Sequence, residues 1–205
     1  MSQPVDPSID RIADLQQLIA DFAKVERALK IPGTDRKEND VDHSYGLALT
    51  CWFMHGKVAP HLDLQKIFMY ALSHDIVELH AGDTFAFDTE AVKTKDEREA
   101  ASLNQVRQDW PDFPGLTDHA QGYADKRDAE AKFVYTIDKL LPSLLIAIGE
   151  GETFWQEHKI TREAHEAEKR KKMNKSPEAI DYMEALNEWL ASRYDFYSPD
   201  QLDQK

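Results

Sequence analysis

The helical spacing of its apolar residues is the feature that most constrains how this chain can fold. From Ile12 to Val25, after the candidate N-cap Ser8, apolar residues recur every three or four positions, which predicts a helix to about Leu29. No segment alternates as a strand does. The other expected helices are at about 43–54, 63–81, 95–110, 128–148, 152–174 and from 177 past 190. We therefore expect an all-α, single-domain bundle of about seven or eight helices.

Several boundaries of these helices are marked by capping residues. Asp63 is a candidate N-cap, Thr94 opens a Thr-x-x-Glu capping box, and Ser176-Pro177 combines an N-cap with proline at the first helical position. Gly82 suits a C-cap with positive φ. The segment 45–54 is apolar nearly all round, so we expect its helix to be buried in the middle of the bundle.

The length fits one domain over residues 1–205, and the composition limits its partners. The chain has 38 acidic and 25 basic residues, a formal net charge of -13. Such a field repels nucleic acid and anionic membranes, so we expect neither as a partner and favour a small-molecule substrate. The single cysteine, Cys51, cannot form an internal disulfide, and we find no signal peptide or membrane-spanning run. A cytoplasmic protein is expected.

Three ionisable residues continue the buried row of the predicted helix 63–81. By helical spacing, the inward positions after Ala71 are those of His74, Asp75 and Glu78. A buried carboxylate needs an ion pair, hydrogen bonds or a metal. The alternative is that this last turn of the helix has already emerged into solvent.

Two other polar residues interrupt apolar helices. Asp138 lies within the apolar row of the predicted helix 128–148. His43 is the first residue of the apolar helix predicted at about 43–54. With His74 and Asp75 they offer two imidazoles and two carboxylates, a set suited to Mn, Co, Fe, Mg or Zn. The zincin motif His-Glu-x-x-His is excluded, because Glu78 stands where its second histidine would be.

The order His43, His74-Asp75, Asp138 resembles the H...HD...D signature of the HD-domain metal-dependent phosphohydrolases, which are all-helical. Within that superfamily the chain is most similar to the bacterial 5'-deoxynucleotidases and their eukaryotic HD-domain-containing relatives. The shared segments are RKENDVDHS, HDIVELHAGD and EAKFVYTIDKL. The resemblance covers about residues 30–145, which would form the metal-site core, with the C-terminal helices at 150–195 packing on it.

The resemblance implies that the protein removes phosphate from nucleoside monophosphates, with a preference for deoxyribose, by means of a water on a divalent metal. The implied metal ligands are His43, His74, Asp75 and Asp138. Proton transfer is implied for Glu78 and Asp83. Glu78, one turn beyond His74, suits the general base, and Asp83 would orient the water or protonate the leaving oxygen. The division of roles between these two carboxylates stays open.

Two basic residues are candidates for binding the phosphate. Arg36 precedes His43 by a short segment and can hold phosphate in a bidentate way, and Lys93 follows the site loop. The segment VERALKIP lacks the Arg-Trp pair of the deoxynucleotidases, and Arg27 or Lys30 would replace it. The segment TFAFD stands where the bacterial members have a Pro-rich turn, so the substrate is less determined than the reaction.

Other functions fit the same signature. The chain could be an HD-fold hydrolase of a nucleoside triphosphate or alarmone, a di-iron oxygenase, which would need further histidine ligands, or a non-catalytic metal-binding helical module. The presence of Glu78 and Asp83 argues against the non-catalytic module. The resemblance also implies a homodimer. The aromatic-rich segment WLASRYDFY could contact a second copy, although packing on the core is its expected use.

Overall fold

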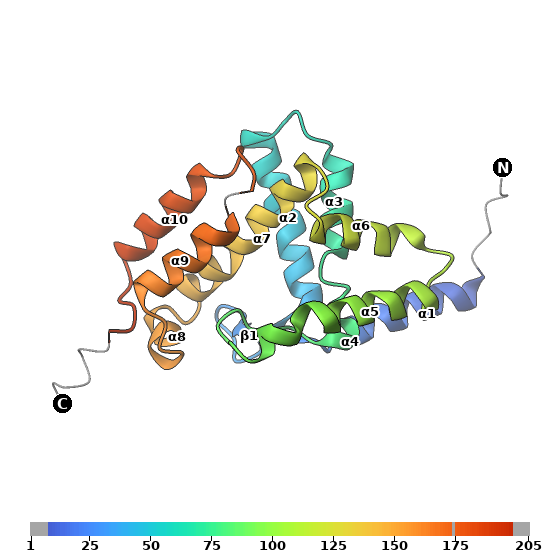
Figure 1. The fold of residues 1–205 in the computed structure, drawn as a ribbon, viewed down its shortest axis with the longest axis horizontal. Coiled ribbons are helices and arrows are strands. Elements are labelled where there is room, and N and C mark those ends of the chain that lie inside the picture. Colours follow the sequence, from blue (N-terminus) through green and yellow to red (C-terminus); the bar gives the residue numbers. More distant parts are fainter. Residues whose placement is uncertain (1–7, 174, 199–205) are drawn as a thin grey trace.

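The computed structural model describes residues 8–173 and 175–198, and its helices confirm the predicted all-α class. Helices α2 and α7 cross the middle, with α3 and α6 on one side, α8, α9 and α10 on the other, and α1, α4, α5 and a small sheet along one end (Figure 1). The elements are α1 (Ile9–Phe22), β1 (Glu26–Lys30), β2 (Lys37–Asn39), α2 (Asp40–Val58), α3 (Leu64–Ser73), α4 (Glu78–Ala81), the 3-10 helix η1 (Ala91–Thr94), α5 (Lys95–Asp109), α6 (Pro114–Ala124), α7 (Ala129–Ile148), α8 (Glu152–Glu157), α9 (Arg162–Met173) and α10 (Asp181–Ala191).

The first helix is shorter than predicted. Ser8 caps α1 as expected, but the helix ends at Phe22 and not near Leu29. The chain then forms the antiparallel hairpin of β1 and β2. Strand β1 has five residues, and among them only Leu29 is buried. A single buried position gives no alternating pattern from which a strand can be predicted. The hairpin brings Arg27 to the first turn of α2.

Helix α2 starts at a capping box that the sequence analysis did not predict. The Asn39 side chain accepts a hydrogen bond from the Asp42 N–H, and the Asp42 carboxylate accepts one from the Asn39 N–H. The expectation that α2 is buried all round is wrong. Its core side includes Leu47, Cys51 and Met54, whereas an exposed apolar stripe is formed by Tyr45, Leu49, Trp52 and Phe53.

The predicted helix 63–81 is divided into α3 and α4. Asp63 caps α3 as expected, yet α3 ends at Ser73. Residues 74–77 form a turn whose backbone hydrogen bonds join residues three apart, and α4 begins at Glu78. Gly82 ends α4 with φ of 73°, a value that favours glycine. His74 and Asp75 therefore lie in a turn and not in a continuous helix.

Helix α7 carries the fourth predicted ligand. The Asp128 side chain caps it by accepting a hydrogen bond from the Ala131 N–H, and Asp138 lies in its middle with 1% of its surface exposed.

The capping box predicted at Thr94 is wrong, because η1 precedes α5 and the Thr94 side chain forms no capping hydrogen bond there.

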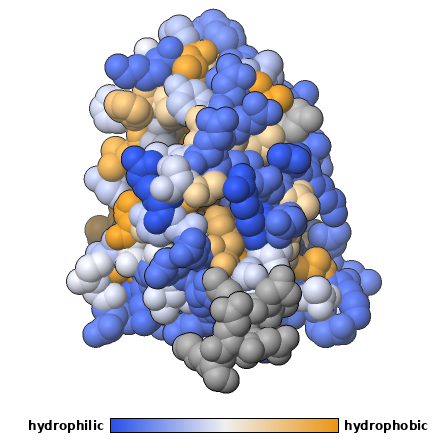
Figure 2. Space-filling view, turned by 90° about the vertical axis from the view of Figure 1, so that its left-hand side faces the viewer, coloured by the Kyte–Doolittle hydropathy of each residue, from blue (hydrophilic) through white to orange (hydrophobic). Residues whose placement is uncertain are grey.

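The C-terminal helices α9 and α10 pack against α7. Two helices, α8 and α9, replace the single one expected at 152–174, and α10 begins at Asp181 and not at Pro177. Aromatic residues of WLASRYDFY pack in one cluster with Trp155, so the expected core packing of that segment is confirmed. The face on the side of α8 and α10 is mostly hydrophilic (Figure 2). The two ends of the predicted domain 1–205 lie outside the described residues.

None of the helices in residues 8–173 and 175–198 combines the length and the apolar character that crossing a membrane requires.

Candidate metal centre

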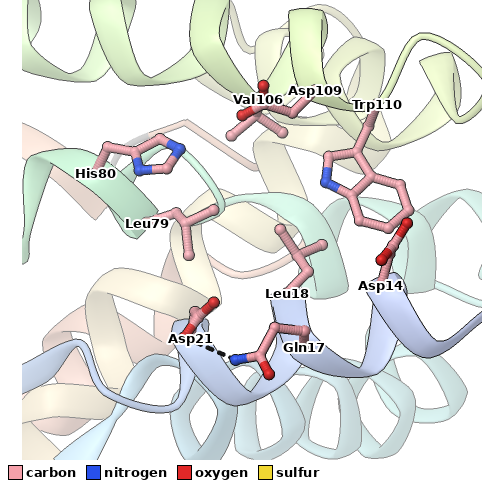
Figure 3. Close-up of a pocket in the computed structure, with 9 residues that line it drawn as sticks. All are labelled: Asp14, Gln17, Leu18, Asp21, Leu79, His80, Val106, Asp109 and Trp110. Carbon is pink, nitrogen blue, oxygen red and sulfur yellow. Dashed lines mark hydrogen bonds between the residues drawn. The ribbon is translucent and has the colours of Figure 1, made fainter. Parts of the chain in front are cut away.

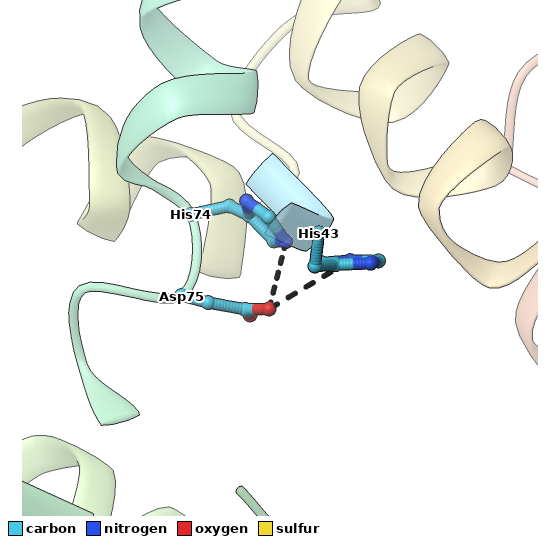
Figure 4. A group of neighbouring side chains, drawn as sticks. All are labelled: His43, His74 and Asp75. Carbon is cyan, nitrogen blue, oxygen red and sulfur yellow. Dashed lines mark ion pairs between the residues drawn. The ribbon is translucent and has the colours of Figure 1, made fainter. Parts of the chain in front are cut away.

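The four predicted ligands gather between α2, α7 and the turn after α3, where His43, His74 and Asp75 each have a ligand atom within 4.8 Å of the other two. Nε2 of His43 lies 3.0 Å from Asp138 Oδ1 and 3.8 Å from Asp75 Oδ2. Nε2 of His74 lies 2.9 Å from Asp75 Oδ2 and 3.9 Å from Asp138 Oδ1. Both imidazoles turn toward the Asp75 carboxylate (Figure 4). Ligands about 2.1 Å from one ion lie roughly 3–3.5 Å apart, so the two shorter distances are close to the spacing around a shared divalent cation and the two longer ones exceed it by a few tenths of an ångström.

The histidine nitrogens give a test of whether these residues fit a metal. Nδ1 of His74 lies 3.0 Å from the Ala71 carbonyl oxygen, and donation of this hydrogen bond leaves the lone pair on Nε2. This buried Nε2, and the buried Nδ1 of His43, have no hydrogen-bond partner among the described residues. Glu38 Oε1 lies 3.6 Å from that Nδ1 and can orient the His43 ring. The donor set and its orphaned nitrogen therefore fit a divalent cation.

The surroundings of Asp138 keep this residue ionised. Tyr123 donates a short hydrogen bond to Oδ2, and Lys139 Nζ lies 2.5 Å from the same oxygen, so Oδ1 is the atom that faces the histidines. Burial alone would raise the pKa of Asp138, but Lys139 and then His43 hold that pKa well below its usual value. An ionised carboxylate is the form that binds a metal.

A second group of carboxylates adjoins the first and surrounds Arg27. Its Nη1 lies 3.0 Å from Asp75 Oδ2 and 3.3 Å from Asp40 Oδ1. Further carboxylates at 3.2–3.9 Å from the guanidinium belong to Glu38, Glu78 and Asp83. Burial and then Asp75 raise the pKa of Asp40 to about 7, although Arg27 lowers it. The guanidinium thus compensates part of a large local negative charge.

The two carboxylates predicted to transfer protons lie at this second group. Glu78 is 2% exposed, and its Oε1 lies 3.6 Å from Lys95 Nζ. Burial, followed by the charges of Asp75 and Asp40, raises the pKa of Glu78 well above its usual value. Asp83, just past α4, reaches the guanidinium from the loop side. Glu78 therefore lies beside the four predicted ligands, next to Lys95 and the guanidinium of Arg27.

Comparison with known proteins places this arrangement in a family. A model described as HD domain matches residues 21–181. The chain belongs to the HD domain family. A solved "predicted metal-dependent phosphohydrolase" from Magnetospirillum magnetotacticum has a TM-score of 0.72 and 25% identity, over 89% of this chain and 96% of that one. A conserved hypothetical protein from Pyrococcus furiosus shares the fold, with a TM-score of 0.60 and 20% identity. The match covers 88% of this chain and 99% of that one. No curated protein matches the chain.

In this HD domain the two predicted phosphate-binding residues lie away from the cluster. Arg36 is exposed, and its Nη1 pairs with Asp42 Oδ2 at 2.6 Å. The exposed Lys93 pairs with Glu90 at 2.6 Å. The structure brings neither side chain to the four ligands.

Three further residues lie beside the predicted ligands of this HD centre. Asp40 was not named from the sequence, whereas Arg27 was a candidate to replace the Arg-Trp pair and Lys95 follows the site loop as Lys93 does. Arg27 contacts the carboxylates of the centre from β1, Asp40 lies one helical turn before His43, and Lys95 starts α5 beside Glu78. The sequence did carry a signal for Asp40, since helical spacing puts positions 40 and 43 on one face. The other two depend on how the hairpin and α5 fold back on the centre.

A separate pocket of about 360 Å³ lies between α1, α4 and α5 (Figure 3). It contains His80 and Leu79 of α4 but none of the four ligands. Its lining residues are Asp14, Gln17, Leu18, Asp21, Leu79, His80, Val106, Asp109 and Trp110. The three carboxylates of this pocket repel a phosphate group, so we do not assign it to a phosphorylated substrate.

Proposed function

We propose that this HD domain is a metal-dependent phosphohydrolase that removes phosphate from nucleoside monophosphates, including deoxynucleotides. The observation that carries the proposal is the convergence of two imidazoles and two carboxylates, with Glu78 beside them and not among them. A purely structural metal site has no use for that extra buried carboxylate. The name of the Magnetospirillum structure supports the reaction class, and the resemblance to deoxynucleotidases supports the substrate.

The ion would be held by His43, His74, Asp75 and Asp138. Nitrogen and oxygen ligands of this kind suit Mn, Co, Mg, Fe or Zn. When bound, a divalent cation supplies a Lewis acid that lowers the pKa of a coordinated water and polarises a phosphoryl oxygen. Lys139 and Tyr123 keep one oxygen of Asp138 engaged, so the other remains directed at the histidines.

Proton transfer falls to the carboxylates of α4 and of the loop that follows it. Glu78 accepts a proton from the attacking water, and Asp83, on the loop after α4, orients that water or protonates the leaving oxygen. Lys95 lies 3.6 Å from Glu78 Oε1 and has a third of its side chain exposed, at 32%. Lys95 Nζ can therefore contact both Glu78 and an incoming phosphate. Phosphate binding is the role that sequence analysis assigned to Arg36 and Lys93.

Phosphate release from a panel of substrates tests the proposal. The panel contains ribo- and deoxynucleoside mono- and triphosphates, each assayed with Mn²⁺, Co²⁺, Mg²⁺, Fe²⁺ and Zn²⁺ after chelator treatment. We expect metal-dependent release from the monophosphates, and its loss together with bound metal in Asp75→Ala. Cleavage of triphosphates alone would contradict the proposed substrate, and absence of hydrolysis with full metal binding would contradict catalysis.

A further inference from the structure

Three carboxylates of the HD centre form a group with the geometry of a second cation site. Ligand oxygens of Asp40, Asp75 and Glu78 lie within 4.8 Å of one another. Asp40 and Glu78 are 0% and 2% exposed, and Asp40 Oδ2 and Glu78 Oε2 have no hydrogen-bond partner among the described residues. Buried carboxylate oxygens without donors are costly, so the group requires positive charge close by.

That positive charge is a side chain of the protein. Nη1 of Arg27 lies 3.3 Å from Asp40, 3.0 Å from Asp75 and 3.9 Å from Glu78. A single nitrogen is thus shared by all three members of the group. All three distances exceed those of strong charge-assisted hydrogen bonds, about 2.7–2.9 Å, and the distances to Asp40 and Glu78 exceed them most. The nitrogen acts on the group as a central cation.

We propose that Arg27 fills a second cation position of the centre, formed by Asp40, Asp75 and Glu78, and so limits the centre to one divalent ion. The inference rests on the proposed binding of the first ion by the two histidines. Asp75 belongs to both ligand groups, so a second ion would lie next to the first, across that carboxylate. The second group supplies only oxygen ligands, which favour Mg²⁺ or Mn²⁺.

Counting bound Mn²⁺ per chain tests the proposal without an activity assay. The full-length protein is stripped with chelator, equilibrated with Mn²⁺ and analysed for metal and protein. We expect one ion in the wild type, two in Arg27→Met, and one again in Arg27→Met/Asp40→Asn. Electron paramagnetic resonance should show an isolated ion in the wild type and a magnetically coupled pair in Arg27→Met. Arg36→Met is the matched control, because it removes a guanidinium outside the centre, and it should keep one ion.

Each other outcome has a definite meaning. Two ions in the wild type, or one ion in folded Arg27→Met, would overturn the proposal. No ion in the wild type would instead refute the first metal site, and with it the proposed function. If Arg27→Met does not fold without metal, Mn²⁺ should restore its folding, and Asp40→Asn should remove that rescue in the double variant. Failure of Mn²⁺ to restore the single variant would also overturn the proposal.

Discussion

Glu78 lies against the metal centre in surroundings that favour its protonated form. Burial is the main cause, and the neighbouring charges of Asp75 and Asp40 add to it, which raises the pKa of Glu78. A divalent cation on the four ligands would bring two positive charges close to Glu78, and positive charge lowers a carboxyl pKa. Binding of the ion would therefore favour the carboxylate form of Glu78, which is the form that accepts a proton. In this way metal binding would prepare the proposed base.

Replacing Glu78 by glutamine separates proton transfer from metal binding. Glutamine is nearly the same size as glutamate but cannot accept the proton, and the four ligands are untouched. We expect Glu78→Gln to fold and to bind metal as the wild type does, while nucleoside monophosphate hydrolysis slows by ~10²- to 10⁴-fold. The measurement is kcat at saturating metal, with bound metal quantified in the same samples.

His80 provides the control for this experiment. It lies two residues further along α4 but lines the separate pocket, so His80→Gln should leave kcat close to the wild-type value. Asp83→Asn should slow turnover if that carboxylate orients the water or protonates the leaving group. Wild-type turnover in Glu78→Gln would show that the mechanism is wrong even where the metal ligands are right.

The four candidate ligands could be singled out because their signals are local in the sequence. His74 and Asp75 are adjacent, and Asp138 interrupts a long apolar row. The contacts of Arg27 with these carboxylates could not be predicted, because they cross from a strand to α2 and to the turn after α3. Arg36 looked suitable by its proximity to His43 in sequence, but its side chain pairs with Asp42 on the surface.

At the scale of elements, α9 is joined to the ligand-bearing helix α7 by buried polar contacts. Lys169 Nζ donates to the Lys139 carbonyl oxygen at 2.6 Å, and His165 Nε2 lies 2.9 Å from Ser143 Oγ. His165 is 2% exposed. Burial, followed by the charge of Lys169, lowers its pKa from 6.5 to about 4. The docking of α9 therefore depends on a neutral imidazole.

This contact predicts a loss of stability in mild acid. Between pH 6.5 and about 4 the unfolded chain binds a proton at His165 that the folded chain does not, so the free energy of unfolding falls as pH falls through this window. The full loss is at most roughly 3 kcal/mol, and above pH 6.5 the group contributes no pH dependence. Denaturant unfolding of His165→Gln should show a shallower pH dependence there than the wild type.

An exposed histidine in the neighbouring helix region serves as the control. His158→Gln should keep the wild-type dependence on pH, since its side chain is exposed at the end of α8. If His165→Gln and the wild type lose stability equally between pH 6.5 and 4, the buried imidazole is not the group responsible.

The elements that sequence periodicity predicted best are the long ones. Helices α2 and α7 are long enough to contain many repeats of the apolar pattern. The break between α3 and α4 is at the turn of residues 74–77, which contains no glycine or proline to mark it in the sequence. Periodicity alone continues a helix through such a turn. The charges at 74, 75 and 78 were the sign that the apolar row had ended, and the structure shows that the helix also ends there.

At the scale of the whole molecule, one face combines apolar side chains with few negative charges. The stripe of α2 continues onto Met69 and Leu72 of α3, which are 41% and 55% exposed. Trp52 of the stripe contacts Phe68 of α3 edge to face. Between positions 43 and 74 the only acidic residue is Asp63, although the whole chain has 38. Two copies of a chain with net charge -13 would repel each other least through this face.

The extent of this face also suits a dimer. Its three exposed aromatic residues are Tyr45, Trp52 and Phe53, at 64%, 56% and 67% exposure. Side chains of this type carry about 150–250 Å² each, so together they present roughly 300–400 Å². Together with the exposed aliphatic side chains beside them, this apolar area approaches the apolar share of an interface that buries about 800 Å² on each partner. We propose that a second copy of the chain covers this face.

Light scattering of the purified protein at micromolar concentration tests the homodimer. We expect a species of about twice the chain mass of 23.5 kDa. Phe53→Glu should convert it to the monomer, because it puts a charge into the contact without touching the core. Ile148→Glu is the matched control: Ile148 is 61% exposed at the end of α7, so the dimer should persist. A wild-type species of 23.5 kDa would refute the dimer, and a dimer that survives Phe53→Glu would refute this face as its interface.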